Sequence, residues 1–116
     1  MNINKYKNGK IYGIRDEKNK LIYIGSSYQP LKIRLARHKT DYTGYMNNLM
    51  GDGTRKPRSY RSSFDVLIQD NPEMFLIKDF PCDSKKELRA EEMKILKYYE
   101  NDTIYKITNK IKMSHL

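Results

Sequence analysis

The sequence predicts a small α/β domain, in which helices flank a three-stranded, largely antiparallel sheet. Two runs of alternating strand-forming residues, 10–15 and 21–24, are separated by a short polar turn. Helix signals follow them, and a third apolar run, 74–77, precedes the last helix. The resulting order of elements, ββααβα, is typical of a single compact α/β unit.

One domain is expected, because the chain has 116 residues and domains usually run to about 100–150. The only cysteine, Cys82, excludes an intramolecular disulfide, and no His/Cys cluster has zinc spacing. The apolar runs are too short to span a membrane, and residues 1–10 do not resemble a signal peptide. We therefore expect an intracellular protein with no membrane partner and no obligatory protein partner.

The elements follow from local signals. Residues 1–9 form a polar lead-in, and the polar turn 16–20 joins the first two strands into a hairpin. Pro30 suits the first turn of a helix that runs to His38. Residues 43–61 are expected to be a basic loop, with at most a helical turn near 45–49. Ser62 and Ser63 then cap a short helix, 83–99 forms a long one, and the tail 104–111 is extended.

The charge of the chain is strongly basic, with a formal net value of +9. Residues 31–61 hold eight basic and two acidic side chains, a net of +6. Such a cluster indicates a polyanion partner, and it lacks the clean apolar face of a membrane-surface helix. Interleaved tyrosines at 42, 45 and 60 are suited to stacking on bases, although a solvated face is the ordinary alternative. The expected nucleic-acid-binding residues are Lys32, Arg37, Lys39, Arg55, Lys56, Arg58 and Arg61.

Two pairs of side chains are candidates for chemistry. Tyr12 and Tyr23 lie on adjacent hairpin strands, where cross-strand packing is the ordinary explanation. Arg34 and His38 are four residues apart on a helix and therefore share one face. The ordinary explanation for that pair is that both side chains face solvent or a phosphate and take no part in chemistry.

Two adjacent carboxylates, Glu91 and Glu92, lie on the last predicted helix. At about 100° per residue, Glu92 falls in the middle of the apolar stripe, and Glu91 falls at its edge. A carboxylate in a buried stripe needs a partner, which is either a divalent cation or an Arg or Tyr side chain.

Several short motifs follow one another along the chain. Lys10-Ile-Tyr12 is followed after ten residues by Tyr23-Ile-Gly25, then by a helix with Arg34 and His38, the carboxylate helix, and an Asn in the tail. In this order and spacing the motifs resemble those of the GIY-YIG nuclease superfamily. The segment 80–89 is similar to single-domain members from large DNA viruses and phages. The resemblance covers about residues 9–110, although the first tripeptide begins with Lys where the family pattern has Gly, and the acidic position is doubled.

The resemblance implies an endonuclease that hydrolyses DNA phosphodiester bonds with one Mg²⁺ or Mn²⁺ ion. Glu92 would hold the ion, with Glu91 as the alternative, and Arg34 would stabilise a phosphate oxygen. Tyr12 would be the general base or orient the water, which requires nearby cations to lower its pKa. The remaining implied site residues are Tyr23 and His38, which position water or phosphate, and Asn109, which adds a polar contact.

Two other functions stay open from the sequence. One is a non-catalytic nucleic-acid-binding domain, and the other is a nuclease or binding protein that acts on RNA. The chain ends soon after Asn109, so we expect low sequence specificity on double-stranded DNA, or recognition of a branched shape.

Overall fold

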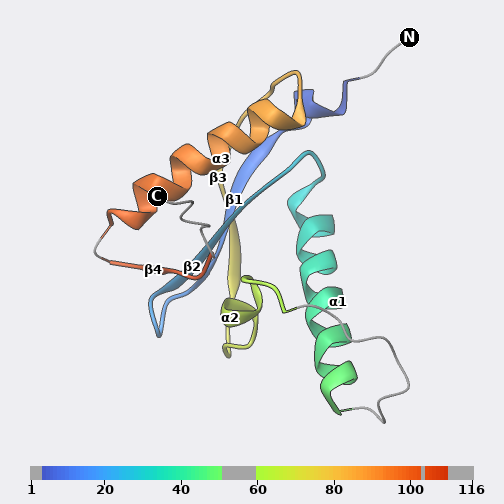
Figure 1. Ribbon diagram of the computed structural model, residues 1–116, viewed down its shortest axis with the longest axis vertical. Coiled ribbons are helices and arrows are strands. Elements are labelled where there is room, and N and C mark those ends of the chain that lie inside the picture. The colour runs from blue at the N-terminus through green and yellow to red at the C-terminus, as the bar shows by residue number, and fades with distance from the viewer. Residues whose placement is uncertain (1–3, 51–59, 103, 110–116) are drawn as a thin grey trace.

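The computed structural model describes residues 4–50, 60–102 and 104–109, apart from the side chain of residue 50. Figure 1 shows a mixed sheet with helices around it, which confirms the α/β class. In chain order the elements are η1 (Lys5–Asn8), β1 (Lys10–Asp16), β2 (Leu21–Ser27), α1 (Leu31–Met50), α2 (Phe64–Leu67), β3 (Glu73–Asp79), α3 (Lys85–Glu100) and β4 (Lys106–Ile107).

The sheet has four strands in the order β3-β1-β2-β4, one more than the sequence predicts. The β1–β2 hairpin is antiparallel, as expected, and β3 pairs antiparallel with β1. The additional strand, β4, pairs parallel with β2 and has only two residues. It is held by hydrogen bonds from Lys106 N to Lys20 O and from Thr108 N to Ile22 O. So short a strand has no periodic pattern of its own, and in the sequence it is indistinguishable from an extended tail.

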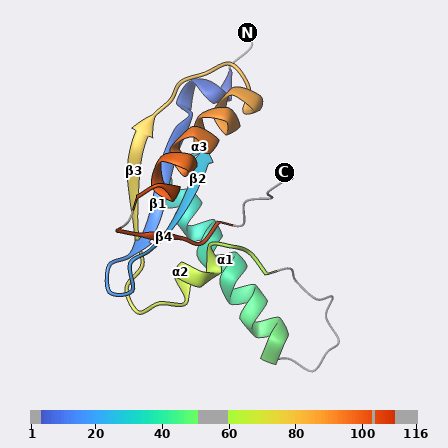
Figure 2. The same cartoon turned by 60° about the vertical axis from the view of Figure 1, so that its left-hand side comes forward.

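Helices cover both faces of the sheet (Figures 1 and 2). On one face, Ile11, Ile22 and Ile24 pack against Leu88 and Leu96 of α3. The other face carries a second cluster made by Tyr12 and Ile14 with residues of α1 and α2. Successive residues of a strand point to opposite faces, so the alternation along β1 and β2 builds both clusters and turns the hairpin tyrosines toward α1.

The expected loop over 43–61 is wrong in its first part, because α1 continues without a break to Met50. The reason is tertiary packing. Tyr42 and Tyr45 lie edge-on or tilted against Phe64, with ring centroids 5.5 and 5.3 Å away, and Tyr60 joins the same cluster. This aromatic packing stabilises the helix through Gly44. It also gives these three tyrosines a partner within the fold.

The amino-terminal segment is more than a polar lead-in. Asn4 caps η1 by accepting a hydrogen bond from Tyr6 N. Phe80 N donates to Gly9 O, and Cys82 N donates to Tyr6 O, so the segment is fastened to the chain just before α3. As a result, side chains of η1 reach the same region as the start of α3.

Candidate active site

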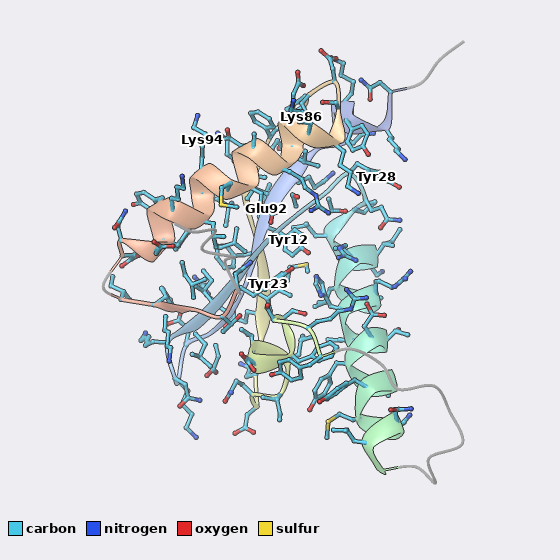
Figure 3. The ribbon with its side chains drawn as sticks, viewed as in Figure 1. Tyr12, Tyr23, Tyr28, Lys86, Glu92 and Lys94 are labelled. Carbon is cyan, nitrogen blue, oxygen red and sulfur yellow. The ribbon has the colours of Figure 1, made fainter. Side chains whose placement is uncertain are left out.

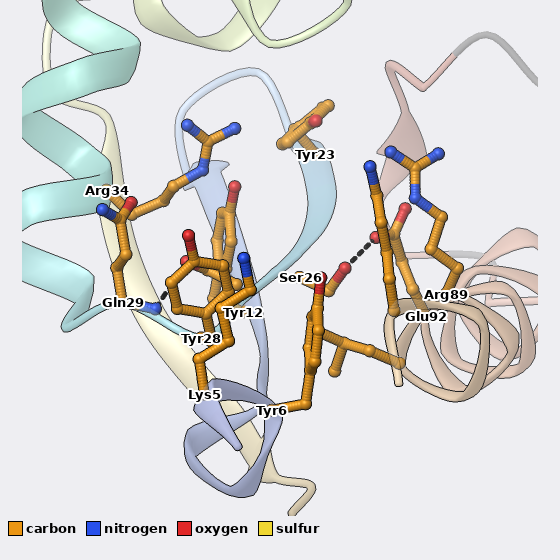
Figure 4. Close-up of a pocket in the computed structure, with 13 residues that line it drawn as sticks. Lys5, Tyr6, Tyr12, Tyr23, Ser26, Tyr28, Gln29, Arg34, Arg89 and Glu92 are labelled. Carbon is orange, nitrogen blue, oxygen red and sulfur yellow. Dashed lines mark hydrogen bonds between the residues drawn. The ribbon is translucent and has the colours of Figure 1, made fainter. Parts of the chain in front are cut away.

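A pocket of about 450 Å³ lies where β1, β2, α1 and α3 approach one another (Figure 4). A second pocket of about 490 Å³ shares Tyr23, Arg34 and Glu92 with the first. The two pockets therefore adjoin at these three side chains, and together they are called the cleft. Every catalytic residue expected from the sequence lines at least one of the two pockets: Tyr12, Tyr23, Arg34, His38, Glu92 and Asn109. Figure 3 shows Tyr12, Tyr23 and Glu92 on the inner side of α3, with Lys86 and Lys94 directed away from them.

A buried chain of three polar side chains forms the floor of this cleft. The Tyr12 hydroxyl lies 2.7 Å from His38 Nε2, and His38 Nδ1 lies 3.2 Å from Ser63 Oγ. Tyr12, His38 and Ser63 are 1%, 4% and 2% exposed. Ser63 occupies the N-cap position of α2, but its side chain makes no capping bond. The expected cap is therefore wrong in its side-chain contact, since this hydroxyl is instead directed to the histidine.

The protonation states of this chain follow from burial. Desolvation, helped by the positive charge of Arg34, lowers the pKa of His38 to about 4, so its ring is neutral at pH 7. A neutral imidazole has one donor and one acceptor nitrogen, and both of its partners here are hydroxyls, so two tautomers satisfy the contacts. In one of them Nε2 accepts the proton of the Tyr12 hydroxyl and Nδ1–H donates to Ser63 Oγ, and in the other both directions are reversed. Desolvation also raises the pKa of Tyr12, and the opposing effect of Arg34 is smaller. The sequence-based expectation that nearby cations would lower this pKa is wrong, because burial outweighs them.

Tyr23 is the second aromatic side chain at the histidine. Its ring lies edge-on to His38, with centroids 5.5 Å apart, and Tyr12 makes a similar contact at 5.8 Å. Tyr12 and Tyr23 do not face each other across the hairpin, because Tyr12 pairs with Gly25 and Tyr23 pairs with Ile14. Burial and the charge of Glu92 raise the pKa of Tyr23, so it is a neutral hydrogen-bonding group at the edge of the cleft.

The two adjacent glutamates have different surroundings. Glu92 is half-buried, lines both pockets and accepts a hydrogen bond from Ser26 Oγ. Glu91 is 7% exposed and binds Lys78 Nζ at 2.8 Å, with Lys94 Nζ at 3.7 Å. The hydrogen bond and charge of Lys78 lower the pKa of Glu91. The prediction that Glu92 is the more buried of the two is wrong, because β3 covers Glu91 through Lys78.

Positive charge dominates the first pocket. Its lining includes four cations and one carboxylate, and none of these cations has an acidic partner within 4.0 Å among the described residues. Figure 4 shows Arg34 and Arg89 on opposite sides of the pocket. A pocket of this charge is suited to an anion such as a phosphodiester. The four cations are Lys5, Arg34, Lys85 and Arg89.

Asn109 lies at the cleft, and its amide binds the backbone of β2. Its Nδ2 donates to Ile24 O at 2.8 Å, and its Oδ1 accepts from Ile24 N at 2.9 Å. The side chain therefore extends the pairing of the tail with the edge of β2. These two bonds fasten the tail to the strand that carries Tyr23, and they leave one N–H and one lone pair of the amide for a further polar contact.

The predicted nucleic-acid-binding residues fall into two groups. Arg55, Lys56 and Arg58 lie outside the described residues. Lys32, Arg37 and Lys39 are exposed on α1, and Arg61 lines the second pocket. Arg37 and Arg61 flank Asp41 at 3.5 and 4.0 Å. The arginine side chain of each ion pair is largely exposed. Such ion pairs are weak, so both arginines remain available to bind phosphate.

Several site residues were not singled out from the sequence. The sequence indicates only a cap at Ser63 and no role for Ser26. Arg89 precedes Glu92 by three residues, and this helical spacing would have placed both on one face. Lys5 and Tyr6 carry no such signal, because only the hydrogen bonds of Tyr6 O and Gly9 O to the segment before α3 bring η1 to the pocket.

No protein-family model matches this chain, and no significant match is found among curated proteins or solved structures. Within the described residues, no helix is long and apolar enough to cross a membrane. The case for a function therefore depends on the chemistry of the cleft.

Proposed function

We propose that this chain is a GIY-YIG-type endonuclease that hydrolyses DNA phosphodiester bonds with a single divalent cation. One observation carries the proposal: a neutral histidine hydrogen-bonded to a tyrosine, an arginine and a carboxylate all meet at one cationic cleft. Phosphodiester hydrolysis needs these functions, namely removal of a proton from water, stabilisation of charge on phosphorus oxygens, and support for the leaving oxygen.

In this proposal the proton moves along the buried chain. The attacking water gives a proton to the Tyr12 oxygen as the Tyr12 proton passes to His38 Nε2. The oxygen of that water forms its bond to phosphorus, and the 3′ oxygen leaves. Because the pKa of Tyr12 is raised, Tyr12 acts as a relay and not as a standing phenolate. Ser63 Oγ accepts from Nδ1–H and so stabilises the imidazolium that forms.

Charge stabilisation falls to Arg34, whose side chain lines both pockets. A guanidinium presents a fixed fork of donors that matches two non-bridging phosphate oxygens. Tyr23 lies beside it at the junction of the pockets, where a neutral hydroxyl can orient the attacking water or the phosphate.

The side chains of the cleft fit a single hard cation. Glu92 supplies a carboxylate oxygen, and Ser26 orients that carboxylate by donating to it. No cluster of three or more His, Cys, Asp or Glu side chains exists among the described residues, so water and phosphate oxygens would complete the coordination. When bound, Mg²⁺ or Mn²⁺ would supply Lewis-acid stabilisation of the 3′ leaving oxygen.

The test is plasmid nicking with Mg²⁺ or Mn²⁺, with and without EDTA, using Glu92→Ala and Glu91→Ala as matched neighbours. We expect metal-dependent nicking that Glu92→Ala abolishes. Glu91→Ala should keep the activity at temperatures where it is folded, since its carboxylate pairs with Lys78. If activity survives in Glu92→Ala but is lost in Glu91→Ala, Glu91 and not Glu92 holds the metal ion.

A non-catalytic nucleic-acid-binding domain is the second candidate, and the burial of Tyr12 at 1% exposure favours it. It predicts DNA binding with no nicking under any metal. A structured RNA included as a parallel substrate separates a DNA enzyme from one that acts on RNA.

A further inference from the structure

The first pocket extends beyond the residues that the proposed chemistry uses. Its far part is lined by side chains from η1, from the turn between β2 and α1, and from the first turns of α3. Figure 4 shows Lys5, Arg34 and Arg89 approaching the same pocket from three different elements. Arg34 belongs to the proposed catalytic group, which leaves Lys5, Lys85 and Arg89 without an assigned role.

Lys5 is held in place by aromatic rings and not by a carboxylate. Its Nζ lies 4.8 Å from the centroid of the Tyr28 ring and 5.5 Å from that of Tyr6. These two rings are themselves packed edge to face at 5.6 Å. A cation–π contact positions an ammonium group but leaves its charge available. By contrast Lys7, two residues further along η1, is paired with Asp83 at 2.7 Å.

The charge of this pocket exceeds what one phosphodiester needs. Four cations and one carboxylate give a net of +3, whereas each phosphodiester carries one negative charge. Successive phosphates of one strand follow one another every ~3.4 Å of helix axis. The positive charge that remains after one phosphodiester is bound is therefore available to the neighbouring phosphate of the same strand.

We propose that Lys5, Lys85 and Arg89 form a second phosphate subsite, which binds the phosphodiester next to the scissile one on the cleaved strand. The subsite rests on the proposed nuclease function, and it specifies which phosphates of the substrate lie at which residues of the cleft. It holds the strand across the cleft from η1 to α3, so that the scissile phosphate lies at Arg34. Gln29, whose half-buried side chain also lines this pocket, is placed to donate to the same phosphate or its sugar.

The experiment uses oligonucleotides just long enough to span the cleft, so that they bind in one register, and a single neutral methylphosphonate replaces one phosphodiester at each of the two linkages on either side of the cleavage position. Binding is measured by fluorescence anisotropy in EDTA, so that no cleavage occurs. At one adjacent linkage the neutral group should weaken binding by the full-length wild-type protein roughly tenfold, the loss expected for one charge-assisted contact. Its effect should be clearly smaller on Lys5→Ala or Arg89→Gln, which have already lost part of that contact.

The matched controls are Lys7→Ala and Lys86→Ala. Lys7 and Lys86 carry the same charge beside Lys5 and Lys85, but they do not line the pocket. These variants should show the same tenfold effect of the methylphosphonate as the wild type. The salt dependence gives a second readout. If Lys5 and Arg89 hold one phosphate, the double variant should flatten the slope of log K against log salt by about 0.9 and not by twice that amount.

The outcomes separate the subsite from the nuclease. Equal sensitivity of all variants to the methylphosphonate at every linkage would overturn the subsite, even if the protein nicks DNA. The subsite is supported if the effect of the methylphosphonate becomes smaller in Lys5→Ala and Arg89→Gln but not in the control variants. This dependence of the methylphosphonate effect on the variant is called coupling. If the protein does not nick DNA, the same coupling, scanned along an uncut oligonucleotide, supports a phosphate site on a binding protein and rejects the nuclease.

Discussion

Gly25 lies directly opposite Tyr12 in the β1–β2 ladder, and the Tyr12 ring crosses the space where a side chain would be. A Cβ on Gly25 would be 2.5 Å from the Tyr12 hydroxyl oxygen and 2.5 Å from the ring carbon that carries it. Steric contact with Tyr12 therefore explains why the third residue of the Tyr-Ile-Gly motif is glycine. Only glycine leaves Tyr12 free to reach His38 across the strand.

Gly25→Ala should consequently displace Tyr12 from His38 and abolish nicking. Overpacking of this kind typically costs about 1–3 kcal/mol of stability, which urea unfolding measures. Gly44→Ala is the matched control, because Gly44 lies inside α1, where alanine stabilises a helix by up to about 1 kcal/mol. Full activity in Gly25→Ala would mean that the Tyr12–His38 contact has no part in the reaction.

Arg34 is expected to act in the chemical step. Arg34→Ala should lower cleavage by roughly a hundredfold to a thousandfold, as removal of one electrostatic donor does in other enzymes. Arg34→Lys keeps the charge and loses the fork of donors, so it should restore only part of the rate. Single-turnover cleavage at saturating DNA measures this step apart from binding. A pure binding role for Arg34 would instead leave the single-turnover rate unchanged.

Tyr12→Phe removes one hydroxyl and keeps the ring. It should abolish nicking and also cost about 1–3 kcal/mol of stability, because buried His38 Nε2 loses its partner. Activity is therefore compared well below the unfolding temperature. Tyr42→Phe, at a half-buried tyrosine that packs on Phe64, is the control and should nick DNA normally. Near-normal cleavage by Tyr12→Phe would leave this tyrosine with a packing role alone.

The sequence predicted the features that depend on local pattern. The hairpin, the positions of β3 and α3, and the shared face of Arg34 and His38 all follow from short periodicities. It also predicted the residues that line the cleft, because the spacing of the motif marks them even where each residue alone is ambiguous.

The errors share one cause, which is a contact between distant parts of the chain. The end of α1 depends on Phe64, and the burial of Glu91 depends on Lys78. The angular position of a glutamate on α3 depends only on the apolar residues of that helix and does not include Lys78 of β3. The pKa of Tyr12 was judged from neighbouring charge, although the depth of the site decides its direction.

The lowered pKa of His38 should be visible in the pH dependence of the free energy of unfolding. Its pKa is about 4 in the folded state against 6.5 for an ordinary histidine. Between these values the unfolded chain binds more protons, so stability falls as pH is lowered from 6.5 to 4 and is constant in this respect above 6.5. The full loss is about 3 kcal/mol.

Urea unfolding of the wild type and His38→Gln at several pH values measures this slope. His38→Gln should remove the slope between pH 6.5 and 5, whereas carboxylates of lowered pKa such as Glu91 keep their contribution nearer pH 4. His115→Gln measures how much of the slope comes from the other histidine of the chain. An unchanged slope in His38→Gln would show that the pKa of His38 is the same in the folded and the unfolded chain, which would contradict the effect of burial on this ring.

The basic segment before α2 should anchor DNA through phosphates without reading bases. Of its four basic residues Arg61 lies at the second pocket, and Arg55, Lys56 and Arg58 lie outside the described residues. Each phosphate contact contributes about 0.9 to the slope of log K against log salt on a duplex. Replacing Arg58 and Arg61 by alanine should therefore flatten the slope by roughly 2 and weaken binding to unrelated sequences equally. An unchanged slope would mean a solvated segment, whereas loss on one sequence alone would mean that these arginines contact base edges.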